Sequence, residues 1–423
     1  MTGLATICAS QAKGGAMKIV PAFGVAHAKT VAFEQDKSER GHSGARPTAR
    51  LLGLIRPDAL LLGEKDWQQL VILRRVVADL GLPVQVIGCC TQREADGLAL
   101  SSRNRYLSAE QRQQAAVLPR VLMAAREQRS ATPSQLVAQV ATELASAGLV
   151  VDYVEAVDPH SLQPAAQLRG LTLLAAAAHC GPSRLIDHVF LMSRQPIVAI
   201  DGPAGAGKST VTRAFAEQLG LIYLDTGSMY RAVTWLVQRS GADPSDTRAV
   251  AAQLENLNLE LSTSADGAQR VSVNGHDVTD AIRSPEVTGQ VSVVAAHGCV
   301  REALTRQQQA MGERGGLVAE GRDIGTAVFP DADLKVFLTA TVAERARRRA
   351  RDLEQRGFAV PDLSELEAQI AERDHLDSTR AVAPLTQAAD AVEVVTDGMA
   401  IAAVIERLLS LFRERVPEDA WRG

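Results

Sequence analysis

The chain has 423 residues, enough for two or three domains that each bury a core of their own. Its 46% hydrophobic and 22% charged residues exclude a disordered or collagen-like chain, and a formal net charge of -4 gives no overall field to attract nucleic acid or an anionic membrane. Five scattered cysteines and the lack of a bilayer-length apolar run predict a cytoplasmic protein in a reducing compartment, whose anionic ligands are bound by local sites.

The first regular elements are predicted after residue 50, because residues 1–50 show neither helical nor strand periodicity, and we assign them no fold. The apolar run 59–62 predicts a buried strand, the apolar spacing over 67–80 predicts a helix, and 84–87 predicts a second strand. A strand, a helix and a strand within about thirty residues are typical of a βαβ unit, which binds ligands at the carboxyl ends of its strands.

A smaller α+β unit is predicted next, with helices over 109–129 and 134–147 and strands over 150–157 and 171–177. Pro119 is expected to kink or split the first helix. The polar stretch 192–196 ends in proline and marks a domain boundary. Directly after it, the apolar run 197–200 predicts the first buried strand of a new α/β domain.

A phosphate-binding loop follows that strand, with Gly-Pro-Ala-Gly-Ala-Gly-Lys-Ser at 202–209 and a predicted helix over 210–219. This is G-x-x-x-x-G-K-[ST] in its required strand, loop and helix setting. Glycines let backbone N–H groups converge on phosphate oxygens, and Lys208 neutralises charge that develops during phosphoryl transfer. Ser209 supplies a hydroxyl for Mg²⁺, so we expect a nucleotide with Mg²⁺ here. A GTPase is disfavoured because no N-K-x-D segment is present.

Three further clusters of charged residues suit an enzyme that holds two phosphorylated molecules end to end. They lie at 224–231 after a short strand, at 316–323 where an apolar strand ends, and at 372–380, where two arginines stand seven apart on a helix. Glu320, in the second cluster, is interpreted as a strand-end acid and is left out of the catalytic set.

The sequence over 196–411 resembles bacterial cytidylate kinase, on the motifs D-T-G-x-M-Y-R-A, V-N-G-x-D-V-T-x-x-I-R, G-R-D-I-G-T and R-A-V-A-P-L. The resemblance implies transfer of the ATP γ-phosphoryl group to CMP or dCMP. The implied domain, 194–423, has the P-loop nucleoside monophosphate kinase fold, a parallel sheet with helices on both faces. A CMP-binding insert is implied at about 243–284, and a lid at about 344–356. The arginine run of the lid is either a solvated helical face or a source of catalytic arginines.

The resemblance also assigns roles to individual residues. The ATP phosphates would be bound by Gly202, Gly205, Gly207, Lys208, Ser209 and Thr210. The catalytic set would be Lys208, Arg322, Arg373 and Arg380, and these three arginines would share the CMP site with Thr226, Arg231, Ser292, Arg301, Asp323 and Asp377. Within that site Ser292, Arg301 and Asp323 would read cytosine, because a carboxylate accepts from its exocyclic amine and arginine donates to the ring acceptors. Asp377 would contact the ribose.

Two alternatives to a CMP kinase stay open for this domain. One is a kinase for another small acceptor such as UMP or shikimate, which a substrate panel would distinguish. The other is a regulatory ATP-binding module, which would leave the three acceptor-side clusters without a role.

Residues 51–193 resemble the later part of bacterial pantothenate synthetase, the pantoate–β-alanine ligase with a Rossmann-like nucleotidyl-transferase domain. The match rests on R-P-D-A-L-L-L-G-E-K-D-W-Q-Q-L at 56–70, R-E-A-D-G-L-A-L-S-S-R-N-R-Y-L at 93–107 and S-R-L-I-D at 183–187. It implies synthesis of pantothenate from pantoate, β-alanine and ATP through pantoyl adenylate. The implied residues are Gly63, Glu64, Lys65, Asp66, Leu100, Ser101, Ser102 and Arg103 for ATP and Gln69 for pantoate.

This part of the chain departs from its family at the paired histidines of the family's opening P-T-M-G-x-L-H-x-G-H. No H-x-G-H segment occurs in the chain, and the stretch 21–30 keeps only Pro21, Gly24 and His27 of that pattern. Two hypotheses follow: an active ligase that takes the histidine function from elsewhere, or an N-terminally truncated, non-catalytic remnant that serves folding or homodimer formation. We favour the remnant, because the lost pieces are those that contact ATP. No nucleic-acid or membrane partner is expected.

Overall fold

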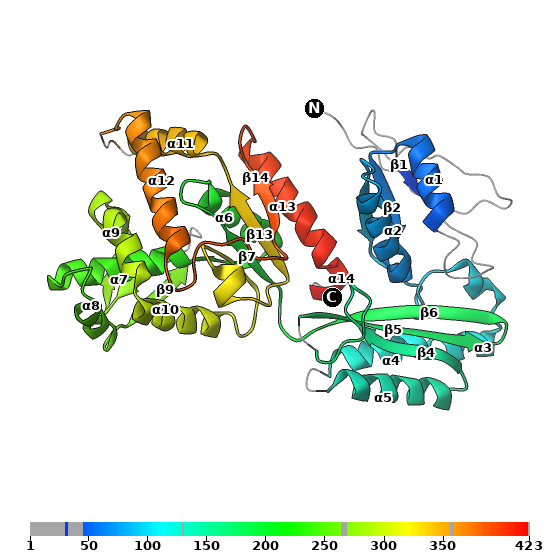
Figure 1. The fold of residues 1–423 in the computed structure, drawn as a ribbon. Helices are drawn as coiled ribbons and strands as arrows, with labels where there is room; N and C mark the ends of the chain where they lie inside the picture. Colours follow the sequence, from blue (N-terminus) through cyan, green and yellow to red (C-terminus); the bar gives the residue numbers. More distant parts are fainter. Residues whose placement is uncertain are drawn as a thin grey trace. The chain divides into compact units, whose positions relative to one another are not determined.

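The computed structural model describes residues 30–32, 45–128, 131–168, 170–263, 269–355, 357 and 359–421. The chain divides into two compact units, which are shown in Figure 1. Unit 1 consists of Met1–Ser193 together with Arg413–Gly423, and unit 2 is Arg194–Phe412. The stretch 21–29, with Pro21, Gly24 and His27, lies outside the described residues.

The first sheet of unit 1 is parallel, with its strands in the order β1 (Thr30–Ala32), β2 (Ala59–Gly63) and β3 (Gln85–Cys89). Helix α2 (Trp67–Asp79) joins β2 to β3 and buries Leu70 and Leu73, which confirms the predicted strand, helix and strand. The register pairs Gly63 with Cys89, so the two strands end side by side. Helix α1 (Ala45–Ile55) was not expected from the sequence.

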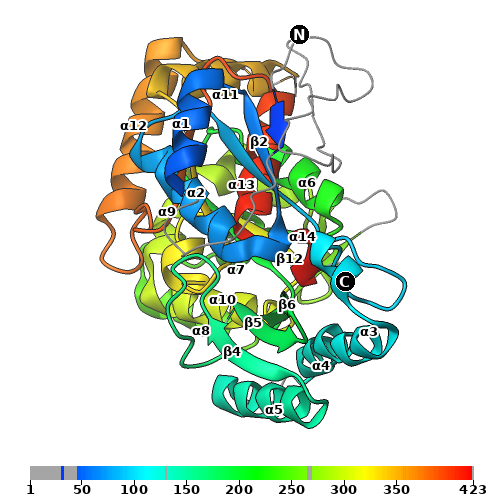
Figure 2. The ribbon, with the colours of Figure 1, turned by 90° about the vertical axis from the view of Figure 1, so that its right-hand side faces the viewer.

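The second sheet of unit 1 is antiparallel, in the order β4 (Val150–Val157), β5 (Leu171–Cys180) and β6 (Ser183–Met192). Helices α3 (Ala109–Ala115), α4 (Val117–Arg126) and α5 (Pro133–Ser146) pack on one face of it (Figures 1 and 2). Pro119 lies in the first turn of α4, where its missing N–H is not needed, so the predicted split of the long helix is confirmed.

The last residues of the chain belong to unit 1, which differs from the expected kinase range of 194–423. Helix α14 (Glu418–Trp421) packs on β6, and Val416 and Ala420 are buried. Short apolar contacts at the end of a chain carry no periodic signal, so the sequence gives no sign of this packing.

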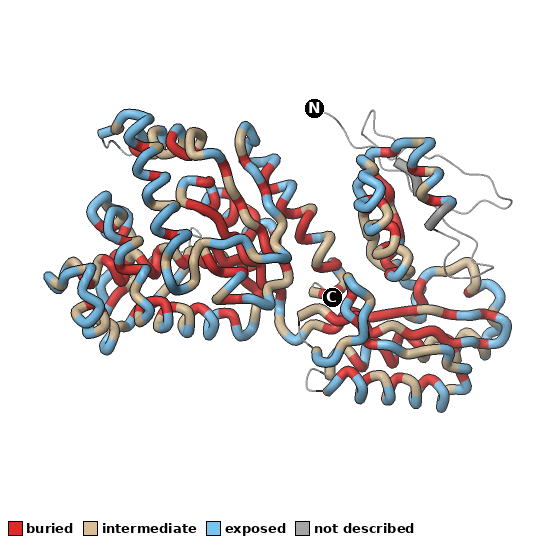
Figure 3. Tube along the Cα trace, in the orientation of Figure 1, coloured by how far each residue is buried: buried red, intermediate tan, exposed pale blue. Residues whose placement is uncertain are grey.

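Unit 2 is built on a five-stranded parallel sheet in the order β14-β13-β7-β12-β8. Its strands are β7 (Ile197–Asp201), β8 (Ile222–Asp225), β12 (Leu317–Gly321), β13 (Leu334–Thr339) and β14 (Val392–Val395). Helices cover both faces (Figure 1), among them α6 (Lys208–Leu219), α7 (Thr226–Ser240), α10 (Gly298–Met311) and α13 (Ile401–Arg415). The central strand β7 is buried along its whole length (Figure 3), as its unbroken apolar run predicts.

Two smaller parts of unit 2 fall where the insert and the lid were expected. The first contains α8 (Thr247–Leu254) and a separate antiparallel sheet of β9 (Leu259–Thr263), β10 (Gln269–Val273) and β11 (His276–Asp277). It is followed by α9 (Pro285–Ala296). The second pairs α11 (Val342–Gln355) with α12 (Leu363–Thr379) through Ala346, Leu353, Leu366 and Ile370. Arg356, at the end of the expected lid, lies outside the described residues.

No helix in the part of the chain that the structure describes combines the length and apolar character needed to cross a membrane.

Candidate active site

The phosphate loop of unit 2 connects β7 to α6, and its glycines have backbone conformations that other residues rarely adopt. Gly202, Gly205 and Gly207 have φ of +147°, +78° and +86°. A Cβ on Gly202 would lie 2.0 Å from the carbonyl oxygen of Leu338, and one on Gly205 would lie 3.3 Å from Cβ of Arg345. The loop therefore requires glycine for both conformation and space.

Lys208 begins α6 and is buried with its ammonium group turned back onto the loop. Its Nζ donates to the carbonyl oxygens of Gly202 at 2.7 Å and Pro203 at 2.8 Å. Burial lowers the pKa of Lys208, and the nearby charges of Arg322 and Arg373 lower it further. This cation thus lies within electrostatic range of two of the predicted acceptor-side arginines.

Glu320, which the sequence analysis left out of the catalytic set, contacts the first turn of α6 after the phosphate loop. It lies near the end of β12, beside β7, and is 5% exposed. The Ser209 hydroxyl donates to its Oε1 at 2.6 Å, while its Oε2 is buried without a hydrogen-bond partner. Burial and the nearby Asp225 raise the pKa of Glu320. The sequence shows only an acid near the end of an apolar strand, and the closeness of Glu320 to Ser209 follows from the pairing of β12 with β7.

Two of the three predicted base-reading residues, Arg301 and Asp323, contact each other, whereas the third, Ser292, contacts Asp377 instead. Asp323 follows β12. Arg301 of α10 donates to its Oδ2, and Arg380 donates to its Oδ1 at 3.4 Å. All three side chains are at least 94% buried. The guanidinium of Arg301 also lies over the ring of Tyr230, 5.2 Å from its centroid, which adds an aromatic residue that the sequence analysis did not single out.

A second acidic centre, Asp377 of α12, brings together further predicted residues. Arg322 donates to its Oδ2 at 3.0 Å, and Ser292 of α9 donates to its Oδ1 at 3.4 Å. Burial acts to raise the pKa of Asp377, but Arg322 and Arg373 outweigh it and hold that pKa below its usual range.

Arg373 stands apart from these pairs, because its Nε is buried without a hydrogen-bond partner. Burial lowers its pKa to about 10, helped by the nearby charges of Arg322, Arg231 and Arg349. Arg231 itself donates to Asp225 at 2.8 Å. Arg322 and Arg231 have carboxylate partners, whereas the buried Nε of Arg373 has none, and a phosphate group would stabilise it.

Two threonines complete the predicted kinase residues. The hydroxyl of Thr226 donates to the carbonyl oxygen of Glu320 at 2.7 Å, so it ties α7 to β12. Thr210 is exposed in the first turn of α6.

The arginines of α11 fall into two groups. The sequence analysis left open whether they form a solvated helical face or supply catalytic arginines. Arg345 donates to both carboxylate oxygens of Asp374 at 3.0 and 2.6 Å and to the carbonyl oxygen of Ala204 at 3.1 Å. Arg348 donates to the carbonyl oxygen of Ala206 at 3.0 Å, and it makes the predicted pair with Glu344 at 3.0 Å. These two arginines therefore contact the phosphate loop, whereas the more exposed Arg347, Arg349 and Arg351 pair with acids of their own helix.

In unit 1 the structure brings the two predicted ATP-binding segments together. Gly63 ends β2, the residues Glu64–Asp66 form the short helix η1, and Ser102–Tyr106 form the short helix η2. Lys65 Nζ lies 3.3 Å from the carbonyl oxygen of Ala99 and 3.4 Å from that of Leu100. The side chain of Leu100 is exposed.

The other predicted residues of this site have local roles. Ser101 accepts a hydrogen bond from the backbone of Arg103, whose side chain donates to the carbonyl oxygen of Arg184. Ser102 starts η2, and Asp66 and Gln69 are partly exposed at the start of α2. Glu64 differs from its neighbours, because it is buried with its Oε2 lacking a hydrogen-bond partner.

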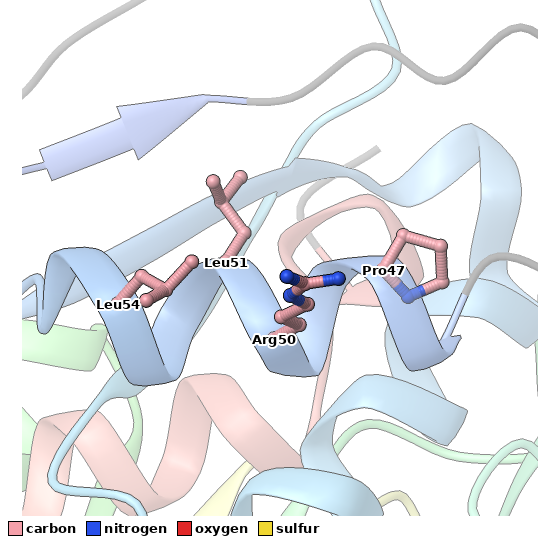
Figure 4. Close-up of a pocket in the computed structure, with 4 residues that line it drawn as sticks. All are labelled: Pro47, Arg50, Leu51 and Leu54. Carbon is pink, nitrogen blue, oxygen red and sulfur yellow. The ribbon is translucent and has the colours of Figure 1, made fainter.

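A shallow pocket on α1 lacks the features of a catalytic site. It is lined by Pro47, Arg50, Leu51 and Leu54, and its apolar side chains project from one helix (Figure 4). Leu54 is 73% exposed. Because these lining residues include only one charged group, we place the candidate site elsewhere.

Comparison with known families divides the chain near the same point as the structure does. The family model described as pantoate-beta-alanine ligase matches residues 33–190, and the model described as cytidylate kinase matches residues 198–414.

Curated relatives carry both parts in one chain. A protein of Parasynechococcus marenigrum (strain WH8102) named bifunctional pantoate ligase/cytidylate kinase is 70% identical over 373 residues, which are 88% of this chain and 73% of the relative. A protein of the same name from Prochlorococcus marinus (strain MIT 9303) is 68% identical over 374 residues, 88% of this chain and 76% of the relative. The crystal structure of pantothenate synthetase from Thermus thermophilus is 40% identical, with a TM-score of 0.33, over 34% of this chain and 54% of that one.

Proposed function

We propose residue roles for each half of the chain from one premise: the chain belongs to the family of bifunctional pantoate ligase/cytidylate kinases. It is an enzyme with a cytidylate kinase domain that uses ATP, fused to a pantoate–β-alanine ligase region. The individual site residues, the metal ion, the preference between CMP and dCMP, and the activity of the ligase region are the proposals developed below.

In the kinase reaction, a phosphate oxygen of CMP attacks the γ-phosphorus of ATP, and the bond from that phosphorus to the ADP leaving oxygen breaks. We assign the ATP phosphates to the loop of Gly202, Gly205 and Gly207 with Lys208. The lysine exchanges its two loop carbonyl partners for phosphate oxygens, and its positive charge stabilises the negative charge that develops between donor and acceptor.

One observation carries this assignment: Lys208 and the arginine cluster share one buried electrostatic environment. Arg322 and Arg373 lower the pKa of Lys208, and Arg322 and Arg231 lower that of Arg373. Mutual repulsion between buried cations favours the binding of anions among them. We therefore place the CMP phosphate and the transferring group between the phosphate loop and these arginines, with Arg380 completing the set.

Recognition of the base is assigned to Asp323 and Arg301. Arg301 and Arg380 hold the Asp323 carboxylate from both sides, and Arg301 is fixed from beneath by the Tyr230 ring. A carboxylate accepts a hydrogen bond from the amino group of cytosine, whereas the carbonyl oxygen of uracil at that position would meet it unfavourably. Asp377, with its Ser292 partner, is assigned to the ribose, and the ribose 2′-hydroxyl is then the group that separates CMP from dCMP.

Ser209, in the first turn of α6, and Glu320, near the end of β12, fit a magnesium ion. Ser209 and Glu320 offer oxygen atoms 2.6 Å apart, and the orphaned Oε2 of Glu320 is a buried acceptor that a hard cation would satisfy. Ser209 and Glu320 would hold the ion, which would neutralise charge on the ATP phosphates.

The test is a substrate panel combined with one variant. The purified chain with ATP should form ADP rapidly with CMP or dCMP and at least about 100-fold more slowly with UMP or shikimate, because those acceptors leave buried polar groups unpaired. Asp323→Asn should lower kcat/KM for CMP by about 100-fold and leave KM for ATP within about threefold. The exposed Asp331→Asn serves as the matched control.

If Asp323→Asn impaired the use of CMP and of ATP equally, the assignment of Asp323 to base recognition would be wrong. Preferred use of UMP or shikimate would overturn the acceptor assignment for the whole site.

For unit 1 we propose binding of ATP phosphates without pantothenate synthesis. The supporting observation is that Lys65 joins the loop after β2 to the 99–100 backbone, so both phosphate-binding segments lie together. The chain has no H-x-G-H segment for the family's paired histidines. Contact between copies of this unit as a homodimer belongs to the same proposal.

A paired assay tests this second proposal. Pantothenate formation is measured with pantoate, β-alanine and ATP in the same preparation that forms CDP from CMP. We expect CDP and no pantothenate. Formation of both products would show that other residues supply the histidine function.

A further inference from the structure

Three potential metal ligands in unit 1 lie together outside the kinase site. They are Glu64, which follows β2, Cys90, which follows β3, and Asp419 of α14. One ligand atom from each lies within 4.8 Å of the other two. The register explains why the first two meet: Gly63 pairs with Cys89, so the residues that follow the two parallel strands emerge side by side.

The buried carboxylate of Glu64 is the second, independent sign of a ligand. Glu64 is 4% exposed, and its Oε2 has no hydrogen-bond partner, although an unpaired buried carboxylate oxygen is costly. The strand β3 also makes room for it, because a Cβ on Gly88 would lie 2.7 Å from Glu64 Oε1.

The charge around the three ligands is negative. Glu418 also reaches the cluster, with its Oε2 3.8 Å from the Cys90 sulfur. On the other side stands Arg74 of α2, which lies over the Trp67 ring and donates to the carbonyl oxygen of Glu414. Arg93 is near Asp419, but its charge is matched by the buried Asp187 at 2.6 Å. Among the described residues, three carboxylates thus surround the cluster, while the nearby Arg74 guanidinium is also influenced by the carboxylate of Glu414.

Burial and repulsion between these negative charges raise the pKa values of two of the three ligands. Burial and the charges of Asp419 and Glu418 raise the pKa of Glu64 to about 7, and burial with the same acids raises the pKa of the Cys90 thiol to about 12. A divalent cation would reverse both shifts, because it stabilises the deprotonated forms.

We propose that Glu64, Cys90 and Asp419 form a binding site for a thiophilic divalent cation of the Zn²⁺ class, which links the C-terminal helix α14 to the loop after β2. A sulfur ligand together with carboxylate oxygens suits Zn²⁺ and Co²⁺ and does not suit Mg²⁺ or Ca²⁺, which take oxygen ligands. Glu418 is a candidate fourth ligand. The site lies in unit 1, apart from the kinase site, and it shares Glu64 with the segment proposed to bind ATP phosphates there.

Cobalt is the probe, because Co²⁺ bound to a thiolate gives a charge-transfer absorption in the near ultraviolet. The full-length chain is stripped of metal with a chelator and titrated with Co²⁺. We expect one equivalent to produce the band and Zn²⁺ to displace it. Cys90→Ser should abolish the band, whereas the matched control Cys89→Ser should keep it.

Asp419→Asn tests the contribution of the C-terminal helix. We expect it to weaken Co²⁺ binding at least about tenfold, the loss that follows even when a group hydrogen-bonded to a metal ligand is removed. Protection of the β2, β3 and β6 amides from hydrogen exchange, measured in each variant without metal, shows that unit 1 is folded. The proposal is overturned if the unaltered chain gives no band, if Cys90→Ser keeps it, or if Asp419→Asn binds Co²⁺ as tightly as the unaltered chain.

Discussion

At the scale of single residues, the kinase site is a set of buried cations that the protein alone does not neutralise. Asp323 and Asp377 balance Arg301, Arg380 and Arg322, but Arg373 has no carboxylate partner among the described hydrogen bonds and ion pairs. Such a site is destabilised without its ligands, since burying an unpaired charge is costly. Nucleotide phosphates would neutralise the unpaired cation, and this relief of the destabilisation would contribute to the affinity for the nucleotide.

The substitution Lys208→Ala tests the role of this lysine. It removes a positive charge that acts mainly on the transition state, so kcat for CMP phosphorylation should fall by about 1000-fold or more. The fold should persist, because the variant also removes a buried ammonium group. Steady-state kinetics and circular dichroism test this together. Turnover within about tenfold of the unaltered chain would exclude the assigned role.

Glu64 makes a prediction about pH in the chelator-treated chain. Its pKa is about 7 in the folded chain against an ordinary value of 4.5, so the folded state binds more protons between these values. Stability contributed by the protonated carboxyl is therefore present below pH 4.5 and is lost as the pH rises through 7. Glu64→Gln should leave the free energy of unfolding near that of the unaltered chain at about pH 5. At about pH 8 the Glu64→Gln substitution should raise the free energy of unfolding by up to about 3 kcal/mol.

Hydrogen exchange of the β2 and β3 amides measures this difference locally. An equal effect of Glu64→Gln at both pH values would contradict the assigned protonation of the carboxylate.

At the scale of elements, the parallel strands and their loops were the most predictable parts of the molecule. Unbroken apolar runs identified β2 and β7, and the glycine spacing identified the phosphate loop, because each of these signals is local. Helix α1 was missed, because it begins within a stretch without periodicity and has no acidic residue in its first turn and no basic residue in its last turn.

The contacts that decide the site were harder to predict because they join distant segments. Arg345 and Arg348 read as part of a charged helical face, yet they donate to carbonyl oxygens of the phosphate loop about 140 residues earlier in the chain. Glu320 was recognised as a strand-end acid, but its closeness to Ser209 depends on β12 lying beside β7. Strand order is not written in the periodicity of any one strand.

The phosphate loop gives a prediction at this scale, with a control at the far end of the helix α6 that follows the loop. Gly202→Ala combines a left-handed backbone with a Cβ 2.0 Å from a carbonyl oxygen, so it should lower the free energy of unfolding by about 3 kcal/mol or more and abolish kinase turnover. Gly220→Ala, at the end of α6, has φ of +70° but open space around its Cβ. It should cost about 1 kcal/mol and keep turnover.

Urea unfolding of unit 2, followed by kinase activity, compares the two alanine variants. Similar losses in both would mean that backbone conformation alone, and not the approach to Leu338, makes glycine necessary at position 202.

At the scale of the whole molecule, the C-terminal end of the chain completes a unit that begins hundreds of residues earlier. Residues 413–423 group with unit 1, where Val416 and Ala420 are buried and α14 packs on β6. Arg74, Arg126 and His160 each hydrogen-bond a backbone carbonyl of this segment. Unit 1 is therefore stabilised by residues that sequence analysis places in the kinase domain.

Removal of residues 417–423 should lower the stability of unit 1 and leave the kinase activity of unit 2 unchanged. The kinase site contains none of these residues, so kcat/KM for CMP should change by less than about twofold. Unit 1 loses the burial of Ala420 and its hydrogen bond from Arg126, so its melting temperature in chelator should fall by about 2–4 °C for each 1 kcal/mol lost, with faster hydrogen exchange in β6. Asp419→Asn, which keeps Ala420, should not reproduce this effect without metal. Loss of kinase activity with unchanged exchange in β6 would instead place the C-terminal segment in the kinase unit.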